Sequence, residues 1–106
     1  MESKRVLDYL DGFSAYMQSG TNLSKRTREL YAYELTLFAR NIENPVLTNL
    51  SPQILLQWNQ MLYDAGAAVN TMNSKHSAVK KFLEYMEEFE GSDHAGRLLR
   101  SLKRLH

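Results

Sequence analysis

The residues best suited to recognition chemistry lie in the stretch VNTMNSKHSAVKKFLEYMEEF, from Val69 to Phe89. At the roughly 100° step of a helix, its apolar residues gather on one side and small polar residues on the other. The polar row consists of Asn70, Ser74, Ser77 and Lys81, with Ala78 among them. A helix face that only meets water usually carries more Glu and Lys, whereas small hydrogen-bonding groups let another surface approach closely. This row is therefore a candidate recognition surface.

Three charge clusters accompany this row. SKRTR at 24–28 and RLLRSLKRL at 97–105 are basic, and EYMEEFE at 84–90 is acidic. Such clusters are most often solvated faces. The formal net charge of the chain is only +1, so overall electrostatics name no partner. The basic cluster at 24–28 adds cations to the candidate surface.

The sequence contains no pattern typical of a catalytic or metal site. It has no cysteine, which excludes disulfides, thiol catalysis and cysteine-based zinc sites. His76, His94 and His106 are far apart and have no partner at metal-ligand spacing. We expect His76 to be partly buried with one hydrogen bond, and His94 to lie incidentally in a loop. The glycines form neither a G-x-G-x-x-G nor a Walker pattern, so we predict no cofactor, no metal and no catalytic residue.

Helix signals divide most of the chain into four clear segments. The first helix is expected over about 4–18, and the second over about 24–41, where Ser24 supplies the N-cap. The third begins at the cap Ser51, which a proline follows, and stops at Gly66. The fourth is the stretch that carries the polar row.

The fourth helix has Asn70 as its expected N-cap. After the break GSD at 91–93, three leucines at helical spacing suggest a short fifth helix, which either docks on the bundle or begins a connection to another segment. These leucines are Leu98, Leu102 and Leu105. No strand pattern or internal repeat interrupts the series. The sequence predicts an all-α fold, a compact bundle of four main helices plus a short C-terminal helix.

Length and composition fit one domain in a reducing compartment. The chain has 106 residues, which is a usual domain size. No apolar run approaches the roughly 20 residues of a membrane span. The start MESKRVLDYL lacks the apolar stretch of a signal peptide. Because cysteine is absent as well, we expect a cytoplasmic protein with no membrane partner.

On the residues alone, two kinds of function remain open. The first is a helical bundle that binds nucleic acid through the polar row and the basic cluster at 24–28. The second is a protein-interaction module that uses Leu30 and Leu37, or the terminal segment Leu98–Leu105. Binding in the first case depends on lysines and arginines, whereas the second predicts self-association through the terminal leucines.

Several motifs occur in an order that distinguishes this bundle from others. An aromatic-rich first helix, LDGFSAYMQS, precedes a capped helix with Ser-x-x-Thr, a Tyr and Leu-x-x-Phe. LTNLSPQILLQW then opens the third helix, and a glycine turn leads to Thr-x-Asn, a Ser-Ala pair and an aromatic. The matching residues are Ser24, Thr27, Tyr31, Leu35, Phe38, Trp58, Gly66, Thr71, Asn73, Ser77, Ala78, Phe82 and Tyr85. Over about 7–90 the chain resembles the N-terminal core-binding (SAM-like) domain of tyrosine recombinases and phage integrases.

The resemblance implies one half of a C-shaped clamp around a recombination site, in which the helices matching 24–41 and 69–89 lie against the major groove. Cutting and joining of DNA would belong to a separate C-terminal domain with a tyrosine nucleophile, so this chain would not itself be an enzyme. We therefore expect 1–106 to be a single core-binding domain. Its four-helix core would cover about 4–90, and 91–106 would be a short helix or a linker toward the catalytic domain.

Helix geometry and the resemblance point to the same face. The residues expected to contact DNA are Lys25, Arg26, Thr27, Arg28, Asn70, Thr71, Ser74, Ser77 and Lys81. Lysine and arginine would neutralise phosphates, and Ser, Thr and Asn would make short hydrogen bonds to phosphates or base edges. The expected partners are double-stranded DNA and the other recombinase subunits in a tetramer of the full-length protein on DNA. The isolated domain is expected to be monomeric.

Overall fold

The structure, a computed structural model, describes residues 4–104. They form five α-helices: α1 (Leu10–Gly20), α2 (Lys25–Asn41), α3 (Pro52–Asp64), α4 (Val69–Phe89) and α5 (Asp93–Lys103). Two short 3-10 turns, Val6–Tyr9 and Leu47–Asn49, precede α1 and α3. Within the described part of the chain there is no strand, and an isolated bridge joins Arg5 to Val46. The predicted all-α fold is confirmed.

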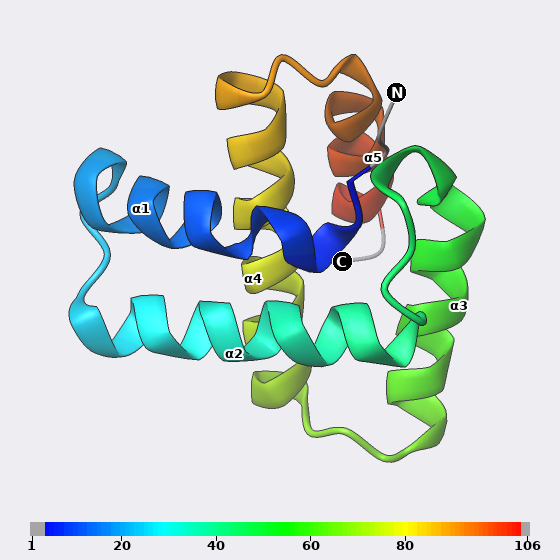
Figure 1. The fold of residues 1–106 in the computed structure, drawn as a ribbon. Helices are drawn as coiled ribbons and strands as arrows, with labels where there is room; N and C mark the ends of the chain where they lie inside the picture. Colours follow the sequence, from blue (N-terminus) through cyan, green and yellow to red (C-terminus); the bar gives the residue numbers. More distant parts are fainter. Residues whose placement is uncertain (1–3, 105–106) are drawn as a thin grey trace.

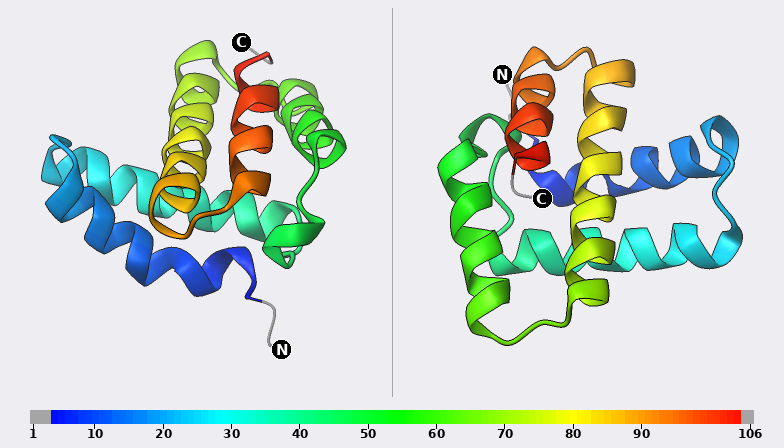
Figure 2. Two further views of the ribbon diagram at one scale, coloured as in Figure 1. Left: turned by 90° about the horizontal axis from the view of Figure 1, so that it is seen from above. Right: turned by 180° about the vertical axis from the view of Figure 1, so that it is seen from behind.

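α1 and α2 form a helical hairpin, and the neighbouring helices α4 and α5 run across it (Figure 1). α1 and α2 run antiparallel, and α4 crosses both at a steep angle (Figure 1). α5 lies beside α4, while α3 stands at the far end of α2 (Figures 1 and 2). The end of the hairpin where α1 connects to α2 projects beyond α4. In all three views α5 and α3 lie on the opposite side of α4 from that end (Figures 1 and 2).

Side-chain caps set the helix boundaries where the sequence places them for α2 and α3. Ser24 Oγ accepts the backbone N–H of Thr27 at 3.2 Å, and Ser51 Oγ accepts that of Ile54 at 3.1 Å. Gly66 follows α3 with a φ of +75°, a conformation that residues with a Cβ rarely adopt. Both N-caps and the glycine stop are therefore confirmed.

Three local predictions at other helix ends are wrong. The segment 4–18 is not one α-helix, because a 3-10 turn precedes α1. Asn70 is not an N-cap, since Ala68 occupies that position and has no side-chain oxygen to accept a hydrogen bond. His94 lies in the first turn of α5 rather than in a loop, because Ser92 caps the helix just before it.

Aromatic side chains form the centre of the core. Phe13 of α1 meets Phe82 of α4 edge-on with ring centroids 5.6 Å apart, and Phe38 of α2 meets Trp58 of α3 at 4.8 Å. These four side chains are all but inaccessible to solvent. One core therefore joins the hairpin, α3 and α4 into a single unit.

The fifth helix docks on this core. Leu98 and Leu102 are buried, and the Nε2–H of His94 donates to the backbone carbonyl of Leu50 at 2.6 Å. Of the two possibilities for the fifth helix, docking is the one found. Self-association through Leu98 and Leu102 is excluded as long as the domain is folded, because both leucines already pack inside it; Leu105 lies outside the described residues.

Gly12 lies in α1 against the end of the Tyr85 side chain. A Cβ at Gly12 would overlap the Tyr85 hydroxyl, and the Tyr85 ring cannot move away easily because it packs against Phe13 at 6.1 Å and Tyr16 at 5.4 Å. We therefore expect Gly12→Ala to lower the free energy of unfolding by about 1–3 kcal/mol, despite the roughly 1 kcal/mol by which Ala favours a helix. Urea denaturation followed by circular dichroism measures this change. A variant as stable as the wild type would contradict the packing described.

Candidate nucleic-acid interface

An ion pair between a buried glutamate and a largely buried lysine joins the two helices that carry the predicted contacts. Lys75 Nζ of α4 lies 2.8 Å from Glu34 Oε1 of α2, and the two side chains are only 16% and 8% exposed. The packing of α2 on α4, like that of α5 on α4, is more extensive than that between the other pairs of helices in the described residues. The start of α2 and the polar row of α4 therefore belong to one rigid unit.

Sequence reasoning missed this pair, although a signal for it exists. Lys75 precedes Val79 by four positions, and Glu34 stands next to Leu35, so each charged residue interrupts an apolar stripe. A charge in a buried stripe needs a partner, because burying it alone is costly. The identity of the partner, 41 positions away, follows only from the fold.

The first turn of α2 divides the four residues predicted there into two groups. Lys25 and Arg26 are exposed, and Lys25 makes only a 4.0 Å contact with Glu29 in which both side chains are largely solvated. Thr27 is half-buried and belongs to the cap, where its Oγ1 accepts the Ser24 hydroxyl at 3.0 Å. Lys25 and Arg26 are thus the cations best placed to reach an external phosphate.

Arg28 lies apart from these two cations. It is half-buried, and its Nη1 donates to the backbone carbonyl of Leu23 at a long 3.4 Å. Together with Lys25 and Glu29 it lines a shallow hollow between α1 and α2. Its guanidinium therefore already contacts the connection between these helices and is less accessible than Lys25 and Arg26.

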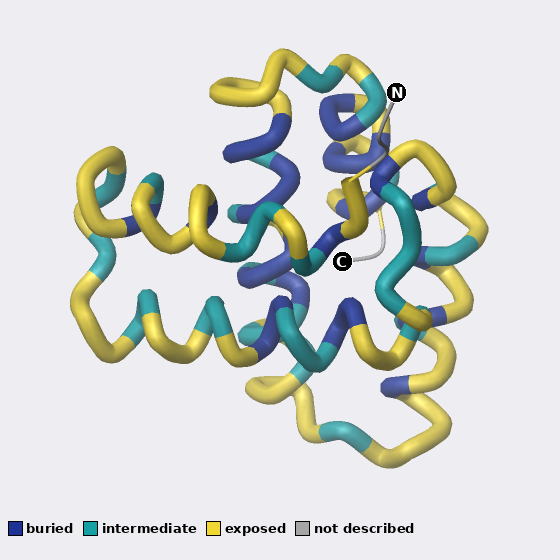
Figure 3. The backbone as a smooth tube through the Cα atoms, viewed as in Figure 1, coloured by how far each residue is buried: buried dark blue, intermediate teal, exposed yellow. Residues whose placement is uncertain are grey.

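The polar row of α4 remains accessible along its length. Asn70 and Thr71 are exposed at the start of the helix, and Ser74, Ser77 and Lys81 are half-buried. Figure 3 shows the exposed first turns of α2 and α4 at the edges of the fold. Ala78 does not belong to the row: it is fully buried, because α1, α2 and α5 all pack on α4 and widen its buried face.

Two residues that the sequence prediction left out lie on the outer side of α4. Asn73 and Lys80 are both exposed. They precede and follow Ser77 by four and three positions, so helical spacing places them beside it. That spacing was available from the sequence, and Lys80 would add a cation to the surface.

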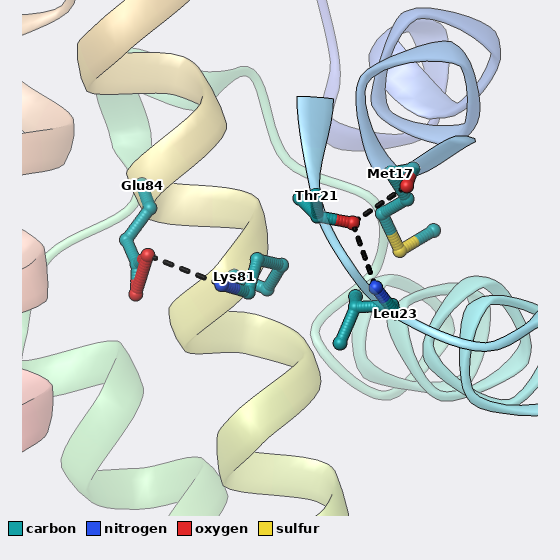
Figure 4. A network of polar contacts seen from close by, with 5 residues as sticks. All are labelled: Met17, Thr21, Leu23, Lys81 and Glu84. Carbon is teal, nitrogen blue, oxygen red and sulfur yellow. Dashed lines mark hydrogen bonds and ion pairs between the residues drawn. The ribbon is translucent and has the colours of Figure 1, made fainter. Parts of the chain in front are cut away.

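The surface has two parts, the first turn of α2 and the polar row of α4, on two helices that the Lys75–Glu34 pair joins. At the far end of the row, the ammonium of Lys81 is paired with Glu84 (Figure 4). Thr21 fixes the connection between α1 and α2, because its hydroxyl donates to the Met17 carbonyl at 2.6 Å. We call Lys25, Arg26, Thr71 and the polar row Asn70, Ser74, Ser77 and Lys81 the candidate interface.

The buried histidine of α4 has a structural partner. His76 is 3% exposed, its Nε2 donates to Asn59 Oδ1 at 2.8 Å, and its ring lies 5.3 Å from that of Trp58. The predicted hydrogen bond is confirmed, and burial is more complete than expected. In residues 4–104 no group of three or more His, Cys, Asp or Glu side chains is placed to hold a metal ion. No helix in the same range is long and apolar enough to cross a membrane.

Comparison with known proteins agrees with this architecture. No curated protein and no solved structure gives a significant match to the chain. The family model of the phage integrase N-terminal SAM-like domain matches residues 10–88, from the first residue of α1 to the last turn of α4. The chain therefore belongs to the family of phage integrase N-terminal SAM-like domains.

Proposed function

We propose that this domain binds duplex DNA through the candidate interface and serves as the DNA-holding part of a tyrosine recombinase. One arrangement carries the proposal. The exposed cations Lys25 and Arg26 and the accessible polar row of α4 are held together by the Glu34–Lys75 ion pair. Membership in the integrase family supports the same role.

The chemistry of the interface suits a phosphate backbone. Lysine and arginine side chains would replace the counterions that surround DNA phosphates. The first N–H groups of α4 have no side-chain cap, so they would be available to a phosphate oxygen at that helix end. Asn70 and Thr71 lie at this end with exposed side chains and could add hydrogen bonds there.

Contacts of this kind position a protein on DNA more than they read its sequence. We therefore propose that sequence preference from this domain is weak. DNA cleavage and rejoining would be carried out by a separate catalytic domain of the same recombinase. Other recombinase subunits on the same DNA would complete the assembly.

The proposal predicts a strong dependence of DNA binding on salt. With about four to six phosphate contacts, the logarithm of the affinity of the isolated domain should fall against the logarithm of salt concentration with a slope of roughly −4 to −5. Fluorescence anisotropy with a labelled duplex of about 20 base pairs, between about 50 and 200 mM salt, measures this slope. Affinity that does not change with salt, or no binding at the lowest salt, would contradict the proposal.

A protein-interaction role keeps one observation in its favour. Leu30 and Tyr33 of α2 are 39% and 61% exposed, although Leu37 is half-buried. This role predicts an association that depends on Leu30 and Tyr33 and is insensitive to salt. Sedimentation velocity at low and high salt, with and without the duplex, separates it from DNA binding.

A further inference from the structure

On the side of α4 that carries the polar row, the side chains beyond Lys81 are acidic. The next residues at helical spacing along this side of α4 are Glu84 and Glu88, three and seven positions further on. A DNA backbone that follows the row from Asn70 therefore meets cationic character at Lys81 and carboxylates immediately beyond it. The polar row therefore ends where a positive charge at Lys81 is followed by the negative charges of Glu84 and Glu88.

Lys81 is already engaged by the first of these carboxylates. Its Nζ lies 3.4 Å from Glu84 Oε2, and the two side chains are 26% and 30% exposed (Figure 4). A pair with this much exposure is weak, so an approaching phosphate can open it. While the pair is closed, however, the lysine offers little net charge to a distant phosphate.

The surroundings of Tyr16 show that both signs of charge meet in this corner. Burial raises the pKa of Tyr16, the positive charge of Lys81 counteracts that rise, and Glu88 and Glu84 add to it. All three charged residues are therefore close enough to act on one ring of α1. Lys25 is also paired with a carboxylate, Glu29, but that contact is longer, 4.0 Å, and both side chains are largely solvated.

We propose that Glu84 competes with DNA phosphate for Lys81 and thereby limits both the affinity and the extent of the contact on α4. This inference rests on the proposed function. DNA binding must first open the Lys81–Glu84 pair, and the freed carboxylate then repels the backbone beyond it. The contact on α4 ends at Lys81 for this reason, and the last two turns of the helix stay off the DNA.

The test is a gain of binding, which a folding defect cannot imitate. Glu84→Gln keeps the size of the side chain and removes its charge. We expect it to strengthen duplex binding about fivefold at low salt and to steepen the salt slope by about 1, because Lys81 then acts as a full cation. Anisotropy titrations measure both quantities, and thermal melts followed by circular dichroism verify the fold.

Glu88→Gln is the matched control. It removes the same charge from the same side of α4 but leaves the Lys81–Glu84 pair intact. We expect a gain of less than about twofold and an unchanged salt slope. A gain from Glu88→Gln equal to that from Glu84→Gln would mean that general repulsion, not competition for Lys81, limits binding, and would overturn the inference.

A double-mutant cycle with Lys81→Ala separates the two mechanisms further. If Glu84 acts through Lys81, Glu84→Gln should give less than half of its logarithmic gain in the Lys81→Ala background. A full gain in that background, or no gain in the wild type, would refute the competition. Either result leaves salt-dependent binding by the wild-type domain in place, whereas failure of the proposed function would abolish that binding in every variant.

Discussion

Replacing Lys75 with Met is expected to lower the free energy of unfolding by about 3 kcal/mol or more. Lys75 neutralises Glu34 at 2.8 Å inside the contact between α2 and α4, where the glutamate side chain is only 8% exposed. Without the lysine, a carboxylate stays in a site that solvent hardly reaches, and removing one partner of such a pair is far more costly than removing a surface charge. Urea denaturation of the variant and the wild type gives the difference.

Two further variants make the result specific. Lys80→Met removes an exposed lysine from the same helix, and we expect its stability to stay within about 0.5 kcal/mol of the wild type. Lys75→Met combined with Glu34→Leu replaces both charges by apolar groups and should recover most of the loss, because no charge is then left buried alone. Equal stability of Lys75→Met and Lys80→Met would show that the ion pair does not hold α2 and α4 together.

Local signals explain why much of the fold can be predicted. The starts of α2 and α3 depend on Ser24 and Ser51, whose side chains bond to N–H groups three residues ahead. The stop after α3 depends on the backbone freedom of Gly66. These interactions lie within a few residues along the chain, so their signatures are visible in the sequence.

Features that depend on packing between helices were predicted less well. Ala78 looks like a member of the polar row at helical spacing, but it is fully buried because other helices pack on α4. The docking of α5 through Leu98 and His94 requires contacts with segments that the sequence alone does not place. Apolar periodicity predicts one buried face per helix, so it misses the additional buried positions of a helix that packs against neighbours on several sides.

In the candidate interface too, some features follow from local sequence and others only from the folded structure. The membership of its polar row follows from spacing, but the half-burial of Ser74, Ser77 and Lys81 does not. Which residues are already engaged does not follow from spacing. Thr27 belongs to a cap, and Lys81 is paired with Glu84, so side chains of the same kind are unequal as phosphate ligands.

Because some predicted phosphate ligands are already engaged within the protein and others are not, the first turn of α2 is the most informative place to test DNA binding. Lys25 and Arg26 are exposed, and the Lys25 side chain, 82% exposed, has only a distant partner. Replacing both with Ala removes two cations from the candidate interface. The matched control is Arg97→Ala with Arg100→Ala, which removes the same charge from exposed positions of α5, on the opposite side of α4 from the α1–α2 connection (Figure 2).

The most direct measurement is the salt dependence of duplex binding by these two double variants and the wild type. We predict that Lys25→Ala with Arg26→Ala makes the slope shallower by about 2 and weakens binding roughly 30-fold at about 0.1 M salt, because two phosphate contacts are lost. The control should retain the wild-type slope and bind within about threefold of the wild type. A slope that is unchanged in the first variant, or reduced equally in both, would contradict DNA binding through the candidate interface.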